Sequence, residues 1–206
     1  FKRLKQAIDQ GRFGRLILGN CQTVCYRSQA YYDSGGWRGT MEHEGGGALM
    51  NQGIHSVDLL LWVMGDVQAV SAYKGILTHD IEVEDTVSAS IQFVNGAMGT
   101  IQATTSVMHG IDKRLEIYGE KGTAIIEGET VVKWEFEDDD LPENTEERRN
   151  QLSPSSPLIE DVQGHRDQIQ DMIEAIRDNR EPAVSGLDGL KAVELVTNIY
   201  KAADSL

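Results

Sequence analysis

The chain has 206 residues, 19 basic and 33 acidic side chains, and a formal net charge of −14. This length favours one domain with a proper hydrophobic core. The charge argues against a surface for nucleic acid or an anionic membrane, which need clustered lysine and arginine, and no apolar run reaches the ~18–20 residues that span a bilayer.

The first residues carry no initiator methionine and no signal-peptide pattern, so we expect a piece of a longer protein. Residues 4–9 are predicted to be the last turns of a helix, which stops at Gly11. A long strand is predicted from Arg15 to about Tyr26. Its apolar residues occur on both faces, which favours a place inside a sheet.

Two cysteines, Cys21 and Cys25, lie in this predicted strand. On one face of a strand they would be about 13 Å apart, too far for a disulfide bond. Two cysteines without nearby histidines also make a poor zinc site. We therefore expect buried thiols in a cytoplasmic protein.

A loop is predicted from Arg27 to Glu44, rich in aromatic residues, glycine and polar groups. Long ordered loops in compact domains are usually functional. The alternative is a surface loop whose tyrosines and tryptophan pack back on the domain. The sequence alone leaves both interpretations open.

The stretch from Glu44 to Gly65 combines three glycines with a long apolar run that ends at another glycine. Glycine frees the backbone at both ends, so the run predicts a helix entered by a tight turn and closed by a glycine cap. One face is apolar by its spacing: Met50, Ile54, Val57, Leu61 and Met64. The adjacent stripe carries Asn51, His55, Asp58 and Trp62. Within that stripe, only His55 changes charge near neutral pH.

After this helix the pattern changes to period two, which predicts strands at 67–76, 86–93, 99–107, 113–118, 123–127 and 130–136. Asn95-Gly96 is a strong hairpin signal, and short turns of this kind join antiparallel neighbours. The polar side of the alternation is rich in threonine, serine and glutamine and poor in lysine. We expect a second copy of the sheet to cover one face, because too few helices remain to cover both.

The last part of the chain begins with an acidic segment, 135–147, which predicts a solvated loop because it lacks the ligand spacing of a calcium loop. A helix is predicted over 165–180, with an apolar stripe of Ile169, Met172, Ile173 and Ile176. Ser185 and Asp188 form a capping-box variant for a final helix. That helix is predicted to run to about Ala203 with Val193, Val196 and Tyr200 inward.

The residues Glu44–Gly65 resemble the C-terminal half of the Gfo/Idh/MocA oxidoreductases, the glucose-fructose oxidoreductase and inositol dehydrogenase superfamily. Further segments fit the family in order and spacing: 11–16, 31–40, 84–85, 95–99 and 117–122. The loop Tyr-Tyr…Trp-Arg-Gly-Thr, with Asn-Gln-Gly-Ile-His at 51–55, is also similar to the branch that oxidises nucleotide-linked sugars at C3.

This resemblance implies an enzyme of two domains. Its N-terminal Rossmann domain holds NAD or NADP and supplies a lysine from a Glu-Lys-Pro motif. Its C-terminal domain is α+β, an open, mainly antiparallel sheet with helices on one face, whose other face commonly forms a homo-oligomer. We expect residues 1–206 to be that single C-terminal domain, because the sequence has no Gly-x-Gly-x-x-Gly and no Glu-Lys-Pro. The cofactor would then be bound mainly by the missing domain.

The resemblance also implies roles for individual residues. His55 falls on the catalytic histidine and is expected to take the proton from a sugar hydroxyl, alone or with the lysine of the other domain. Asn51 falls where many members carry aspartate. An aspartate could stabilise an imidazolium by its charge, whereas an asparagine can only form hydrogen bonds. We expect Asn51 to hydrogen-bond a sugar hydroxyl or the nicotinamide side. The substrate side is expected to include Tyr31, Trp37, Arg38, Arg27 and Asp58. One of the two arginines would hold an anionic group, and Asp58 would orient His55 or serve as a structural partner.

Other interpretations of these residues compete with this one. A histidine on a largely apolar helix is more often a core residue. The alternative function is a non-enzymatic module that binds a sugar or a protein, or only assembles. A hydrolytic role for His55 has little support, since no nucleophile in a strained turn accompanies it. No metal site is expected, because the remaining histidines lie in or beside loops: His43, His79, His109 and His165.

Overall fold

The computed structural model of the chain describes residues 1–128, 130–137 and 163–205. In these ranges, one sheet of seven strands has the order β2-β3-β4-β1-β5-β6-β7. Its strands are β1 (Leu16–Val24), β2 (Val67–Gly75), β3 (Thr86–Phe93), β4 (Met98–Thr104), β5 (Arg114–Gly119), β6 (Gly122–Glu127) and β7 (Thr130–Phe136). The prediction that the first strand is interior is confirmed, because β1 lies between β4 and β5.

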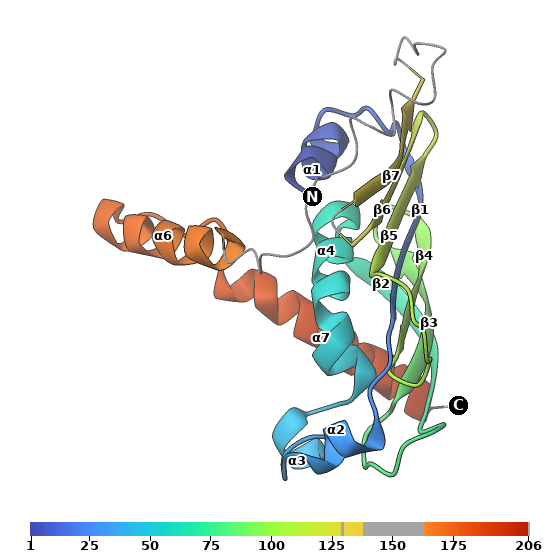
Figure 1. Cartoon of the computed structure of the whole chain (residues 1–206). Helices are drawn as coiled ribbons and strands as arrows, with labels where there is room; N and C mark the ends of the chain where they lie inside the picture. The colour runs from blue at the N-terminus through green and yellow to red at the C-terminus, as the bar shows by residue number, and fades with distance from the viewer. Residues whose placement is uncertain (129, 138–162, 206) are drawn as a thin grey trace.

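Most neighbouring strands are antiparallel, and β1 runs parallel to β4. The helical elements are α1 (Lys2–Asp9), α2 (Gln29–Asp33), α3 (Met41–Glu44), a π-helical turn η1 (Leu49–Gly53), α4 (Ile54–Met64), α6 (Gln163–Asp178) and α7 (Gly186–Asp204). Helices α1, α4 and α7 lie on one side of the sheet, and no described helix covers the opposite face, which we call the bare face (Figure 1). The predicted α+β class, with helices on one face of an open, mainly antiparallel sheet, is confirmed.

The core lies between this helical layer and the inner face of the sheet. In β3, the residues Val87, Ala89, Ile91 and Phe93 are buried, and the serines and glutamine between them are exposed. Because side chains of a strand alternate between faces, the period-two prediction also identified which face is covered. Leu60 of α4 and Ile199 of α7 are fully buried in the same cluster.

The apolar face predicted for the central helix is wrong at several positions. Met50, Ile54 and Leu61 are only half-buried, whereas Leu49 and Leu60 have no exposed surface. The physical reason is the π-helical turn, which places an extra residue in the first turn and so rotates the residues that face the sheet. The polar stripe remains outside, and His55 is exposed.

The segment predicted as one loop from Arg27 to Glu44 contains the two short helices α2 and α3. The thiols also differ from the prediction: Cys21 is buried, but Cys25 lies beyond the end of β1 and is half-exposed. Both thiols are free, so the prediction of no disulfide is confirmed. Most of the predicted acidic loop 135–147 lies outside the described residues.

The last two helices differ in their packing: α7 lies on the sheet, and α6 does not (Figure 1). Helix α6 projects away from the body (Figure 1), and its predicted apolar stripe is exposed, with Ile176 at 75%. In α7 the predicted capping box of Ser185 and Asp188 is present, and Val196 is buried as predicted. Val193 is 41% exposed, which corrects its inward assignment. Among the described helices, none is both long and apolar enough to cross a membrane.

Candidate functional site

A hollow of about 280 Å³ lies where the chain leaves β1, and we call it the β1 hollow. Side chains from β1, the segment after it, η1, α4 and the segment before β5 line it. It brings together residues predicted for the site: Arg27, Tyr31, Asn51 and His55. Gln52 and Lys113 also line it, and the sequence interpretation did not assign them a role.

Asn51 lies in η1 and His55 in α4, and we call these two consecutive elements the site helix. Glu84 holds the site helix at its start. One carboxylate oxygen of Glu84 accepts from the N–H of Gly47 at 2.9 Å, and the other accepts from Leu49 at 3.0 Å. These N–H groups belong to a helix start, where they have no partner within the helix. A Cβ atom at Gly47 would lie 1.8 Å from the Glu84 carbonyl oxygen, so this close approach requires glycine.

The surroundings of Glu84 shift the pKa of its carboxyl group. Burial raises the pKa of its carboxyl group, and the hydrogen bonds from Leu49, Tyr200 and Gly47 offset only part of that rise. The hydroxyl of Tyr200 donates to Glu84 at 2.7 Å and accepts from the N–H of Met50 at 3.2 Å. Helix α7 therefore helps to fix the start of the site helix.

His55 and Asn51 are four residues apart and border the same hollow. The imidazole of His55 is exposed and makes no hydrogen bond to any other residue that the structure describes. In contrast, the amide of Asn51 donates to Glu44 and accepts from Gln52 at 3.0 Å. Glu44 also accepts from the N–H of Gly39 at 2.6 Å. Asn51 is thus oriented by its neighbours, and His55 faces the hollow unpaired.

Two cations give the β1 hollow a positive wall in a chain whose net charge is −14. Burial raises the pKa of the Cys25 thiol, and the charges of Arg27 and Lys113 act in the opposite direction. The guanidinium of Arg27 lies 5.3 Å from the centre of the Tyr31 ring. Its Nη1 donates to the carbonyl of Tyr26 at 3.0 Å, and its buried Nε has no partner among the described residues. Arg27 therefore brings its positive charge to the hollow.

Three residues predicted for the substrate side do not line the β1 hollow. The guanidinium of Arg38 lies 4.6 Å from the ring of Tyr31 and 4.8 Å from the ring of Trp37, which is 44% exposed. Arg38 lines a second hollow, of about 320 Å³, together with Tyr32 and Glu82.

Asp58 lies near His55 but forms no ion pair with it. Burial and the charge of Asp188 raise the pKa of the Asp58 carboxyl, and His55 lowers it. A larger hollow, of about 520 Å³, lies between β2 and α7 and contains none of the residues predicted for the site. Among the described residues, no group of His, Cys, Asp and Glu side chains converges as metal ligands.

Known proteins resemble this chain in both sequence and fold. The family model described as the GFO/IDH/MocA C-terminal domain matches residues 1–125. The WlbA dehydrogenase of Chromobacterium violaceum, solved in complex with NADH and UDP-GlcNAcA, is 35% identical with a TM-score of 0.83, and the match covers 99% of this chain and 57% of that chain. The corresponding complex from Bordetella pertussis is also 35% identical, with a TM-score of 0.81, over 98% of this chain and 57% of that one.

A curated relative extends the comparison. The myo-inositol 2-dehydrogenase of Thermotoga maritima is 27% identical over 207 residues, which cover 95% of this chain and 56% of the relative. This chain therefore spans little more than half the length of the proteins that it matches. In this chain, the matched residues include the open sheet and the β1 hollow.

Proposed function

This chain belongs to the family of GFO/IDH/MocA C-terminal domains, and we propose that it is the substrate-binding half of an NAD(P)-dependent dehydrogenase. The reaction proposed is oxidation of a secondary hydroxyl of a sugar or nucleotide sugar. The observation that carries this proposal is the unpaired, exposed imidazole of His55 beside a hollow with a positive wall. Such a place suits a proton acceptor next to a bound, anionic substrate.

Oxidation of an alcohol to a ketone removes a hydride from carbon and a proton from oxygen. A nicotinamide cofactor held by another part of the enzyme would supply the hydride acceptor. The proton passes to His55, whose imidazole becomes an imidazolium, and the C–O bond becomes a carbonyl. An imidazole titrates near neutral pH and therefore suits this proton transfer. Asn51, held between Glu44 and Gln52, is placed to hydrogen-bond the substrate at the same wall.

The substrate proposed is a nucleotide sugar. The two WlbA structures hold UDP-GlcNAcA, a ligand with several negative charges. In this chain Arg27 and Lys113, which line the β1 hollow, supply matching positive charge. Tyr31 lies against Arg27 and offers an aromatic face to the hollow.

The dinucleotide does not fit the residues of this chain. The sequence contains no Gly-x-Gly-x-x-Gly, and Gly45–Gly47, its densest glycine run, is closed against Glu84. A phosphate would need those N–H groups, but the N–H of Gly47 donates to the Glu84 carboxylate and the N–H of Gly45 donates to the carbonyl of Met41. We therefore place the binding of NAD or NADP outside residues 1–206, and no step assigned to this chain depends on it.

The bare face of the sheet is the proposed surface of a homo-oligomer. Met98, Leu18 and Tyr118 lie side by side across β4, β1 and β5. Met98 is 59% exposed and Leu18 is 38% exposed, and the next pairs along β1 and β4 on this face are polar, Asn20 with Thr100 and Gln22 with Gln102. An exposed apolar row beside polar side chains is typical of an interface between subunits.

Sedimentation velocity tests this surface. Leu18→Lys places a charge in the centre of the row and is expected to shift the oligomer toward monomer, because an unpaired charge resists burial. Ile176→Lys, on the projecting helix α6, is the matched control and should leave the sedimentation coefficient unchanged. An unaltered oligomer in Leu18→Lys would place the interface elsewhere.

Steady-state kinetics of the full-length enzyme test the role of His55. His55→Ala is expected to lower kcat by about 10²–10⁴-fold, the usual contribution of a general base, with a small change in KM for the sugar. His165→Ala, on the exposed surface of α6, is the matched control and should leave both constants unchanged. Unchanged turnover in His55→Ala would contradict the assignment.

A further inference from the structure

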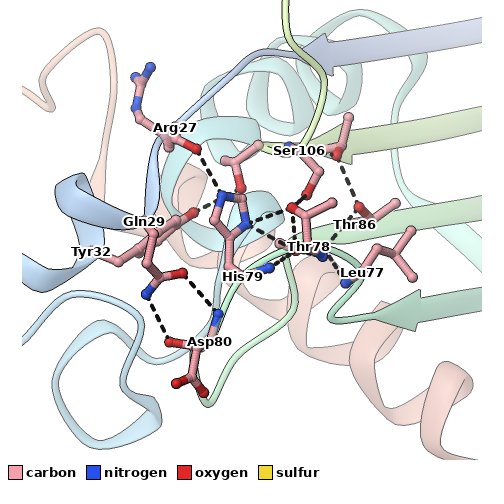
Figure 2. A network of polar contacts seen from close by, with 12 residues as sticks. Arg27, Gln29, Tyr32, Leu77, Thr78, His79, Asp80, Thr86 and Ser106 are labelled. Carbon is pink, nitrogen blue, oxygen red and sulfur yellow. Dashed lines mark hydrogen bonds and ion pairs between the residues drawn. The ribbon is translucent and has the colours of Figure 1, made fainter.

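Asp85 has no exposed surface, and its carboxylate contacts four residues of the polar network that Figure 2 labels: Leu77, Thr78, His79 and Thr86. Its carboxylate accepts from the N–H groups of Leu77 and Thr78, both at 2.9 Å, and from the N–H of His79 at 3.2 Å. The hydroxyl of Thr86 adds a donor at 3.0 Å. Burial raises the pKa of this carboxyl, but the donors outweigh burial and hold the pKa below its usual range.

The ring of His79 is buried, with 4% of its side chain exposed, and both of its nitrogens have partners. Nδ1 lies 3.0 Å from a carboxylate oxygen of Asp85, and Nε2 lies 2.8 Å from the carbonyl oxygen of Arg27. A carbonyl oxygen and an ionised carboxylate only accept hydrogen bonds. The hydroxyl of Thr78 also lies 3.1 Å from Nδ1, but it donates to Ser106 at 2.7 Å. With Asp85 and Arg27 as acceptors, both ring nitrogens donate, which is the doubly protonated, positively charged form of histidine.

This contact fixes the main chain of Arg27 from one side. The N–H of Arg27 donates to the carbonyl of Thr105 at 2.8 Å, so both of its backbone polar groups are held. Tyr32 contacts both partners of Arg27. Its hydroxyl lies 2.8 Å from the hydroxyl of Thr105, and its aromatic ring packs edge to face on the ring of His79, with 4.9 Å between the ring centres. Figure 2 shows the carbonyl of Arg27 directed at His79 and its side chain pointing the other way.

Besides the contact between His79 and Arg27, a second pair of hydrogen bonds joins the segments 77–80 and 27–32, and we call each of these two attachments a clamp. The side-chain amide of Gln29 donates to the carbonyl of Asp80 at 3.1 Å and accepts from the N–H of Asp80 at 2.9 Å. The segment 77–80 is therefore attached to the segment 27–32 at two neighbouring points. Because both clamps use backbone atoms, the direction in which the Arg27 side chain leaves the main chain is determined by this attachment.

We propose that His79, held as an imidazolium by Asp85, is a positioning residue that directs the guanidinium of Arg27 into the β1 hollow. The inference deepens the proposed function, because it rests on Arg27 as the residue that binds the anionic part of the substrate. A neutral imidazole donates through one nitrogen only and would release either Asp85 or Arg27. Charge-assisted hydrogen bonds are also the stronger kind, which suits a fixed support.

A double-mutant cycle with UDP-GlcNAcA, measured by titration calorimetry on the 206-residue chain, tests the coupling. His79→Gln retains one amide donor and loses the charge, and it is expected to weaken binding about tenfold, as the loss of a charge-assisted hydrogen bond would. In the Arg27→Ala background, His79→Gln is expected to cause no further loss. His165→Gln is the matched control and should bind as the parent chain does.

An equal loss from His79→Gln with and without Arg27 would overturn the inference, because a merely structural effect does not depend on that side chain. Nitrogen-15 NMR of the histidine rings provides a test that needs neither ligand nor variant. Both ring nitrogens of His79 are expected to be protonated at neutral pH, and one unprotonated nitrogen would overturn the inference. If the parent chain does not bind UDP-GlcNAcA, the proposed substrate fails, and the NMR result alone decides the inference.

Discussion

Two consecutive carboxylates at the start of β3 hold two different regions of the molecule. Glu84 faces the start of the site helix, and Asp85 faces the segment 77–79, which supports Arg27. Both residues are buried, at 6% and 0% exposure. Their pKa values nevertheless shift in opposite directions, up for Glu84 and down for Asp85.

The difference lies in the partners, since burial alone raises the pKa of both groups. Glu84 receives two helix N–H groups and a tyrosine hydroxyl, and these donors do not offset burial. Asp85 receives more donors and also faces the ring of His79. The balance between burial and hydrogen-bond donors therefore determines the charge of a buried carboxyl. The Asp85 region is therefore the one in which a lost partner costs most.

Removal of the Asp85 carboxylate is expected to have the largest effect on stability. Asp85→Ala removes the acceptor of the N–H groups of Leu77 and Thr78 and of the buried Nδ1 of His79, and we expect a loss of about 3–5 kcal/mol in the free energy of unfolding. Urea titration of the chain measures it. Asp66→Ala, which removes an exposed ion pair with Lys191, should change stability by about 0–1 kcal/mol. Equal losses in the two variants would contradict the contrast.

The Glu84 region is expected to be sensitive to added volume. Gly47→Ala would place a methyl group against the Glu84 carbonyl and displace the helix start, at a cost of about 1–3 kcal/mol. Thermal unfolding of the variant measures the effect. Gly186→Ala is the matched control, because a Cβ there meets no atom within 4 Å. If Gly47→Ala were as stable as its control, the close approach of Glu84 would not constrain the site helix.

The two regions also predict opposite responses to pH. The folded pKa of Asp85 is lowered, so the stability that it contributes is present above its unfolded pKa of about 3.9 and is lost as the pH falls below it. The folded pKa of Glu84 is raised, so protonation of Glu84 favours the folded state.

Urea titrations across acid pH distinguish the two residues. Each group changes the slope of stability against pH by at most about 1.4 kcal/mol per pH unit. Asp85→Asn should reduce the loss of stability at low pH, and Glu84→Gln should increase it. The same change of slope in both variants would mean that the two carboxyls do not differ in the folded state.

Local patterns predicted the sheet well, and partners far apart in the chain explain most of what they missed. Strands such as Thr86–Phe93 follow from alternation and turn signals that need only neighbouring residues. The π-helical turn rotates the buried face away from Met50. The sequence analysis missed this turn, because no local spacing of residues indicates the extra residue. His79 was set aside as a loop histidine, since its partner Arg27 lies 52 positions away.

The candidate site was predicted from the family resemblance more than from residue patterns. His55 and Asn51 were identified by their place in the motif, and the structure puts both at the β1 hollow. Lys113 was missed because a single lysine at the first position of a predicted strand carries no signal of its own. Trp37, Arg38 and Asp58 lie outside the hollow, and their roles stay predictions.

Chemical-shift mapping of the isotopically labelled chain with UDP-GlcNAcA tests the central claim most directly. The claim is that the β1 hollow is the substrate site of this domain. We predict that the perturbed residues cluster at that hollow, on Arg27, Tyr31 and His55. Ser90, on the bare face of the sheet, is predicted to be unaffected. Perturbations centred on the larger hollow between β2 and α7, or no perturbation at all, would contradict the claim.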